Sequence, residues 1–89
     1  MNEIIKIKKA LNKLGLTPNL KGYHYVAEGV KLLKEDFEKN GKYRPFMEVY
    51  GSVADVYGVK PNNVERNIRH AMLVSKQNNT EFFTMLFGN

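Results

Sequence analysis

The stretch "VADVYGVKPNNVERNIRHAM" at residues 53–72 has the pattern of two helices joined by a tight turn. Ala54 and Gly58 stand four residues apart, and Pro61 opens the second segment. A helix-turn-helix needs a small residue where its helices cross closely, and glycine takes the left-handed backbone of the turn at little cost. Proline suits the first helical position, where no amide donor is needed. The stretch therefore predicts a helix-turn-helix, although the spacing also fits a purely structural helical corner.

The predicted second helix has an apolar side and a polar side at helical spacing. The side expected in the core, together with Val59 of the turn, comprises Val64, Ile68, Ala71, Met72 and Ser75. The candidate DNA-binding residues on the opposite side and its flanks, where Leu73 also lies, are Lys60, Asn62, Asn63, Glu65, Arg66, Arg69 and His70. A recognition helix reads the major groove from its N-terminal end. There arginine pairs with guanine, asparagine with adenine, and glutamate with cytosine.

Five of these seven polar residues also have an ordinary interpretation. Glu65 and Arg69 are four residues apart and fit a surface ion pair worth about 0.2–0.5 kcal/mol. Asn62 and Asn63 fit turn chemistry at the start of a helix. His70 fits an exposed spacer. Their presence together on one face favours contact with nucleic acid over these explanations taken singly.

Working outward, the apolar spacing predicts an all-α fold of five helices. The stripes expected to be buried in the first three helices are Ile4, Ile7, Leu11 and Leu14; Tyr23, Val26, Val30, Leu33 and Phe37; and Phe46, Val49, Val53 and Val56. Gly15, Gly41 and Gly58 follow these stripes and predict the ends of the helices. After the helix that begins at Pro61, a short apolar helix is expected over about residues 80–87.

Length and composition limit the classes of function. The 89 residues suffice for one small helical domain over residues 1–89, and there is no cysteine. The two histidines are far apart, so we expect no metal and no cofactor. The chain lacks a cysteine nucleophile, a cleft with paired carboxylates and a phosphate-binding glycine loop, so we expect no enzyme. It also lacks a membrane span or signal peptide, so we expect a cytoplasmic protein without membrane contact.

The net charge of +5 arises in the first half of the chain. Residues 1–45 contain ten Lys/Arg against five Asp/Glu, whereas residues 46–89 contain four of each kind. A basic balance is compatible with an anionic partner and equally with simple solubility. The charge therefore does not identify the partner by itself.

Two segments resemble the C-terminal DNA-binding domain of stage-zero sporulation protein A, the response regulator that commands sporulation in Firmicutes. They are "LGLTPNLKGYHYVAEGV" at residues 14–30 and "VERNIRHAM" at residues 64–72, and the "LFG" of residues 86–88 also matches. The resemblance spans about residues 8–88. The matching positions are Gly15, Leu20, Lys21, Gly22, Tyr23, Tyr25 and Glu28, then Val64, Glu65, Arg66, Ile68, Arg69, His70 and Ala71.

The resemblance implies a sequence-specific transcription regulator that binds double-stranded DNA, with residues 61–76 in the major groove. It also implies head-to-tail copies on tandem boxes, and we consider a homodimer and a contact with RNA polymerase as further partners. Asn63 stands where the family has arginine, and Lys60 where it favours a capping threonine. The loop "KYRPFME" is two residues longer than that of the family. We expect no receiver domain before Met1, and no further helix after Gly88.

A second function remains open: a protein-interaction module that binds or antagonises a regulator or a polymerase subunit. It would use the apolar C-terminus, with Phe82, Phe83, Met85 and Phe87, or the face around Leu73. Under the first function, DNA binding should depend on the base sequence and its affinity should fall steeply as the salt concentration rises. Under the second, DNA should be bound weakly or without sequence preference.

Overall fold

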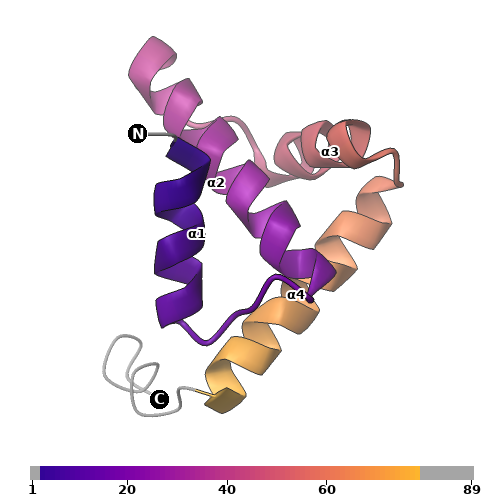
Figure 1. Cartoon of the computed structure of the whole chain (residues 1–89). Helices are drawn as coiled ribbons and strands as arrows, with labels where there is room; N and C mark the ends of the chain where they lie inside the picture. The colour runs from indigo at the N-terminus through magenta and orange to yellow at the C-terminus, as the bar shows by residue number, and fades with distance from the viewer. Residues whose placement is uncertain (1–2, 79–89) are drawn as a thin grey trace.

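The chain is all-helical, with no strand, over the residues that its computed structural model describes, which are residues 3–78. The helices are α1 (Glu3–Lys13), α2 (Lys21–Asn40), α3 (Phe46–Tyr57) and α4 (Pro61–Asn78). The long helix α2 packs against each of the other three, and α3 packs against α4 (Figure 1). The helix expected at residues 80–87 lies outside the described residues, so the number of five helices is not confirmed. Over residues 3–78, no helix is apolar over enough of its length to cross a membrane.

The predicted helix boundaries are confirmed. Gly15, Gly41 and Gly58 have φ angles of 83°, 72° and 66°, in the left-handed region that glycine enters without strain. The amides of Gly41 and Gly58 each donate a hydrogen bond to the carbonyl four residues earlier and so close the ends of α2 and α3. The fourth helix begins at Pro61, as its suitability for the first helical turn predicts.

Two clusters of buried apolar side chains hold the helices together. The first joins α1, α2 and α4 through Leu11, Leu16, Tyr23, Ala27 and Ala71. The second joins α2, α3 and α4 through Tyr25, Val49, Val53, Ala54 and Val64. Val64 is fully buried and Val59 packs against the second cluster, which confirms the core predicted around the turn. Because α2 and α4 contribute to both clusters, their contact fixes the position of α4.

At the crossing of α2 and α4 the two helices approach backbone to backbone. A Cβ atom placed on Gly22 would lie 2.2 Å from the carbonyl oxygen of Asn67 and 2.6 Å from the Cβ of Ala71. Both distances are far shorter than any van der Waals contact. Only a hydrogen atom fits at this position, so the glycine is required for packing rather than for its backbone conformation.

Five apolar residues predicted for the core are exposed instead, and for them the prediction was wrong. They are Val30 and Phe37 on α2, Phe46 and Val56 on α3, and Met72 on α4. Beyond Gly29, the only buried residue of α2 is Asp36. The second half of α2 thus extends past the helices that cover its first half. Periodicity identifies one side of a helix but not the length over which neighbours cover it.

Asp36 anchors the loop of residues 41–45. The guanidinium of Arg44 donates from Nε and Nη2 to the two carboxylate oxygens of Asp36, at 2.7 Å each, and the Arg44 backbone amide donates to Oδ2 at 3.1 Å. Arg44 Nη1 donates to Ser52 Oγ of α3 at 3.0 Å. The loop is therefore tied to both helices that it connects.

We expect the pair of Asp36 and Arg44 to make stability depend on pH in acid. The hydrogen bonds from Arg44 lower the pKa of Asp36 in the folded chain. The stabilisation is complete above the carboxyl pKa of the unfolded chain, about 4, and is lost as the pH falls through the lower folded value. Urea unfolding should show a deficit for Arg44→Met that is largest near neutral pH and shrinks below about pH 4. Lys13→Met, which removes an exposed cation of α1, serves as control. A deficit that does not change with pH would contradict the assignment.

The C-terminal half of α4 holds the end of α1. Ser75 Oγ, which is fully buried, donates to the carbonyl of Leu14 at 2.5 Å, and Asn78 Nδ2 donates to the carbonyl of Gly15 at 3.2 Å. Carbonyls at the end of a helix lack partners within the helix. Here α4 supplies them.

Candidate nucleic-acid interface

The candidate interface is built on α3, residues 58–60 and α4, which we call the α3–turn–α4 unit. Ala54 is buried where α3 meets α4, and the amide of Val59 donates to its carbonyl at 3.0 Å. The amides of Asn63 and Val64 donate to the carbonyl of Lys60. Lys60 thus occupies the N-cap position of α4 with a side chain that cannot accept a hydrogen bond.

The structure leaves the polar face of α4 accessible. Lys60, Asn62, Arg66, Arg69 and His70 are exposed, and Asn63 and Glu65 are partly buried. Val64, Ala71 and Ser75 on the opposite side are buried. The division of α4 into a core side and a polar side therefore agrees with the sequence pattern, with Met72 as the exception.

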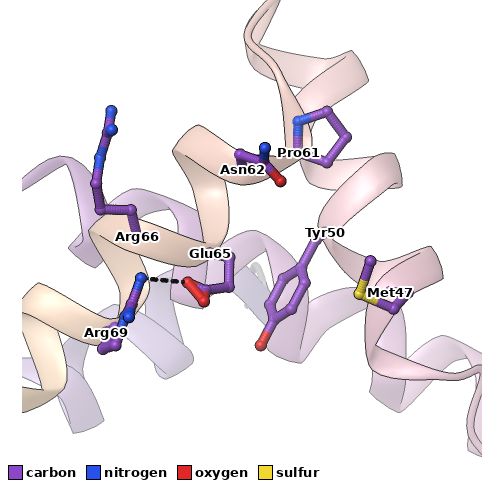
Figure 2. A pocket seen from close by; sticks show the side chains of 7 residues that line it. All are labelled: Met47, Tyr50, Pro61, Asn62, Glu65, Arg66 and Arg69. Atoms are coloured by element: carbon purple, nitrogen blue, oxygen red, sulfur yellow. Dashed lines mark hydrogen bonds and ion pairs between the residues drawn. The ribbon is translucent and has the colours of Figure 1, made fainter.

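Four of the seven candidates meet in one open groove of about 400 Å³. They are Asn62, Glu65, Arg66 and Arg69. Pro61 and two residues of α3, Met47 and Tyr50, complete its lining (Figure 2). The structure does not bring Lys60, Asn63 or His70 into this lining.

Sequence reasoning did not identify Met47 and Tyr50 as part of the site. The Tyr50 ring lies beside Glu65, on the far side of this residue from Arg69 (Figure 2). Met47 is 73% exposed and lies on the other side of Tyr50 from Glu65 (Figure 2). No local signal marks either residue, because their place in the groove depends on how α3 packs against α4.

Glu65 and Arg69 form the ion pair that their spacing predicts. Arg69 Nη2 donates to Glu65 Oε2 at 2.8 Å, and their side chains are 71% and 40% exposed respectively. A guanidinium has five N–H groups, so this bond leaves most of its donors available. The ordinary interpretation as a surface pair is thus confirmed for the protein without a partner, and the pair also orients Arg69 at the groove.

Asn63 is engaged within α4. Asn67 Nδ2 donates to both the carbonyl oxygen and the side-chain Oδ1 of Asn63, at 2.8 Å each. This interaction lies inside the helix and is not a cap, because Lys60 occupies the N-cap position. The side-chain amide nitrogen of Asn63 is the group that this interaction does not use.

The two helices of the unit differ in charge. Residues 60–78 contain four basic residues and one acidic residue. The basic residues are Lys60, Arg66, Arg69 and Lys76, and the acidic residue is Glu65. By contrast, α3 contains Glu48 and Asp55 and no basic residue. The positive N-terminal end of the α4 dipole adds to the charge near the turn. An anionic partner would thus be attracted by α4 rather than by α3.

The described residues contain no group of three or more histidine, aspartate or glutamate side chains that could hold a metal ion. What the groove offers is hydrogen-bond donors and acceptors on an exposed helix, beside one apolar and one aromatic side chain. This is the chemistry of a recognition surface.

Comparison with known proteins bears on the nature of that surface. No solved structure matches the chain. The model of the family described as "Sporulation initiation factor Spo0A C terminal" matches residues 7–89, which is nearly the whole sequence. Members of this family are DNA-binding regulatory domains, the effector part of a sporulation response regulator, and are not known as enzymes. The chain therefore belongs to the Spo0A C-terminal family, as the segments at residues 14–30 and 64–72 predict.

Proposed function

We propose that the protein is a transcription regulator that binds specific sequences of double-stranded DNA through α4 in the major groove. The observation that carries the proposal is the meeting of Asn62, Glu65, Arg66 and Arg69 at one open groove along the N-terminal half of α4. These residue types form hydrogen bonds with base edges. The family of the chain makes DNA the partner to test first.

Each residue has a role in this proposal. Arg66 and Arg69 pair with guanine, Asn62 with adenine, and Glu65 accepts from cytosine N4 while it holds Arg69. Lys60 and His70, which are exposed, contact phosphates and set the register of the helix on the duplex. Asn63 offers its amide nitrogen at a position where related sequences have arginine, so we expect a base preference that differs from theirs.

The lack of basic residues on α3 affects affinity. The first helix of such a unit crosses the DNA backbone, and here it brings Glu48 and Asp55 instead of cations. The phosphate contacts then fall to α4 and its turn. Few contacts give weaker affinity and a dependence on salt that is less steep than the sequence alone predicts, since log K falls with log salt at about 0.9 per phosphate neutralised.

Fluorescence anisotropy tests the proposal. The protein would be titrated at two salt concentrations with a duplex that carries two tandem sporulation-regulator boxes, and with a scrambled duplex of equal length and composition. We expect tighter binding to the boxes, by at least about tenfold, with affinity for both duplexes falling as salt rises. Equal affinity for both would contradict sequence-specific binding, and no binding to either would contradict DNA binding altogether.

A protein-interaction module remains the second candidate because apolar side chains are exposed outside the groove. Leu73 of α4 is 53% exposed, and a polymerase subunit is one partner that it would suit. The apolar cluster at residues 82–87 lies outside the described residues. Under this alternative Leu73→Ser weakens capture of the partner, whereas under our proposal it leaves affinity for the boxes unchanged.

A further inference from the structure

An apolar surface on the second half of α2 and the start of α3 has no covering element among residues 3–78. Its members, which we call the aromatic face, are Val30, Leu33, Phe37, Tyr43, Pro45 and Phe46. Phe37, Tyr43 and Phe46 are 54%, 61% and 67% exposed. The face contains two open grooves of about 360 and 500 Å³ that share Leu33 and Tyr43. It shares no lining residue with the groove on α4.

The size of the face marks it as an interaction surface. An aromatic side chain presents roughly 200 Å², so the exposed parts of the three rings come to roughly 350 Å². The largest apolar patch on a typical monomer is about 300–600 Å² and is often functional. The aromatic face reaches this range from three side chains, before Val30 and Leu33 are included.

The face is held in shape before any partner arrives. The Phe37 and Tyr43 rings stack with their centroids 5.5 Å apart and their planes at 26°. Between Tyr43 and Phe46, the loop is fixed by the hydrogen bonds of Arg44 to Asp36 and Ser52. A surface that is already ordered loses little conformational entropy on binding.

We propose that a second copy of this chain covers the aromatic face, as a symmetric dimer that forms without DNA. A two-fold interface must be self-complementary, because the same patch meets itself. The face meets this condition, with the projecting pair of Phe37 and Tyr43 beside the groove that Leu33, Pro45 and Phe46 line. Its rim carries both signs of charge, Lys42 and Glu38, whereas Lys34 nearby is already paired with Glu3. Rotation about a two-fold axis places the rings of one copy in the groove of the other.

The dimer is weak. The rings of two copies bury roughly 700 Å², whereas stable interfaces begin near about 1,200 Å². We therefore expect a dissociation constant in the micromolar range or above, roughly 10 μM to 1 mM. The protein is then monomeric when dilute and dimeric where its local concentration is high.

Sedimentation velocity of the whole chain without DNA tests the proposal over a concentration series that spans this range. The weight-average sedimentation coefficient should rise with concentration. Phe37→Ser and Tyr43→Ser should each raise the dissociation constant by at least about tenfold. Leu73→Ser is the matched control, since Leu73 is as exposed as Phe37 but lies on another helix, and it should leave association unchanged. Circular dichroism verifies that each variant keeps its helices.

Two results would overturn the proposal: a monomer at every concentration, or association that Leu73→Ser weakens as much as Tyr43→Ser does. Amide chemical shifts supply an independent check, because the shifts that depend on concentration should gather at residues 30–46. Changes centred on α4 instead would point to a different interface and also overturn it. Because no DNA is present, failure here leaves the DNA-binding proposal untouched, and Arg69→Ala should associate like the wild type.

Discussion

Replacing Gly22 by alanine is expected to destabilise the folded chain by roughly 3 kcal/mol or more. The new Cβ would lie 2.2 Å from the Asn67 carbonyl oxygen, which belongs to the backbone of α4 and cannot rotate away. The two helices must separate to admit it, and this loosens Tyr23, Ala27 and Ala71, which are packed around the crossing. Urea or thermal unfolding followed by circular dichroism measures the effect.

Gly51→Ala is the matched control for this prediction. Gly51 lies inside α3, and a Cβ atom there would meet nothing within 4 Å. Alanine favours a helix over glycine by about 1 kcal/mol, so this variant should gain stability. If both substitutions change stability equally, the close contact at Gly22 is not the cause. Should Gly22→Ala remain folded, it should also bind DNA poorly, because the crossing positions α4.

Replacing Arg69 by alanine is expected to weaken specific binding to the boxes by about 1–3 kcal/mol, which is roughly fivefold to 150-fold. The structure places Arg69 at the groove with its side chain 71% exposed and its guanidinium held on one side by Glu65. A guanidinium that binds guanine O6 and N7 gives two hydrogen bonds that alanine cannot replace. Binding to the scrambled duplex should fall much less, by the loss of one charge. Anisotropy titrations of both duplexes provide the measurement.

Two further variants, Lys39→Ala and Glu65→Gln, are compared with Arg69→Ala in the same titrations. Lys39 lies in the last turn of α2 and is exposed, so its removal changes net charge equally without touching the groove. It should leave the preference for the boxes intact. Glu65→Gln removes the charge that holds Arg69 and should reduce specificity by less than Arg69→Ala does. Unchanged affinity of Arg69→Ala for the boxes would rule out Arg69 as a base reader.

The helix ends and the α3–turn–α4 unit were predictable because local chemistry determines them. Gly15, Gly41 and Gly58 end helices through a backbone conformation that other residues seldom adopt, and Pro61 begins one through its missing amide hydrogen. These signals do not depend on the rest of the chain. The polar face of α4 follows from period alone, once Val64 is assigned to the core.

What the sequence did not reveal depends on contacts between distant segments. Gly22 reads as an ordinary helical glycine until α4 is brought against it. Phe37 continues an apolar stripe, yet no helix among residues 3–78 covers that end of α2. Met47 and Tyr50 became part of the groove only because of how α3 packs on α4. In each case the residue type can be read from the sequence, but the residues that pack against it in the fold cannot.

The attachment of α1 has a consequence for how the protein opens. Among the helices, α1 lies against α2, its Leu11 shares the first cluster with Ala71 of α4, and the end of its segment is held by Ser75 and Asn78, 61 and 63 residues further along the chain. Release of α1 breaks these contacts but leaves the cluster of Tyr25, Val53 and Val64 closed. We therefore expect α1 to detach more readily than the second cluster opens. A partly opened form, with α1 detached and its amides exchanging with solvent, still retains the surface proposed to read DNA.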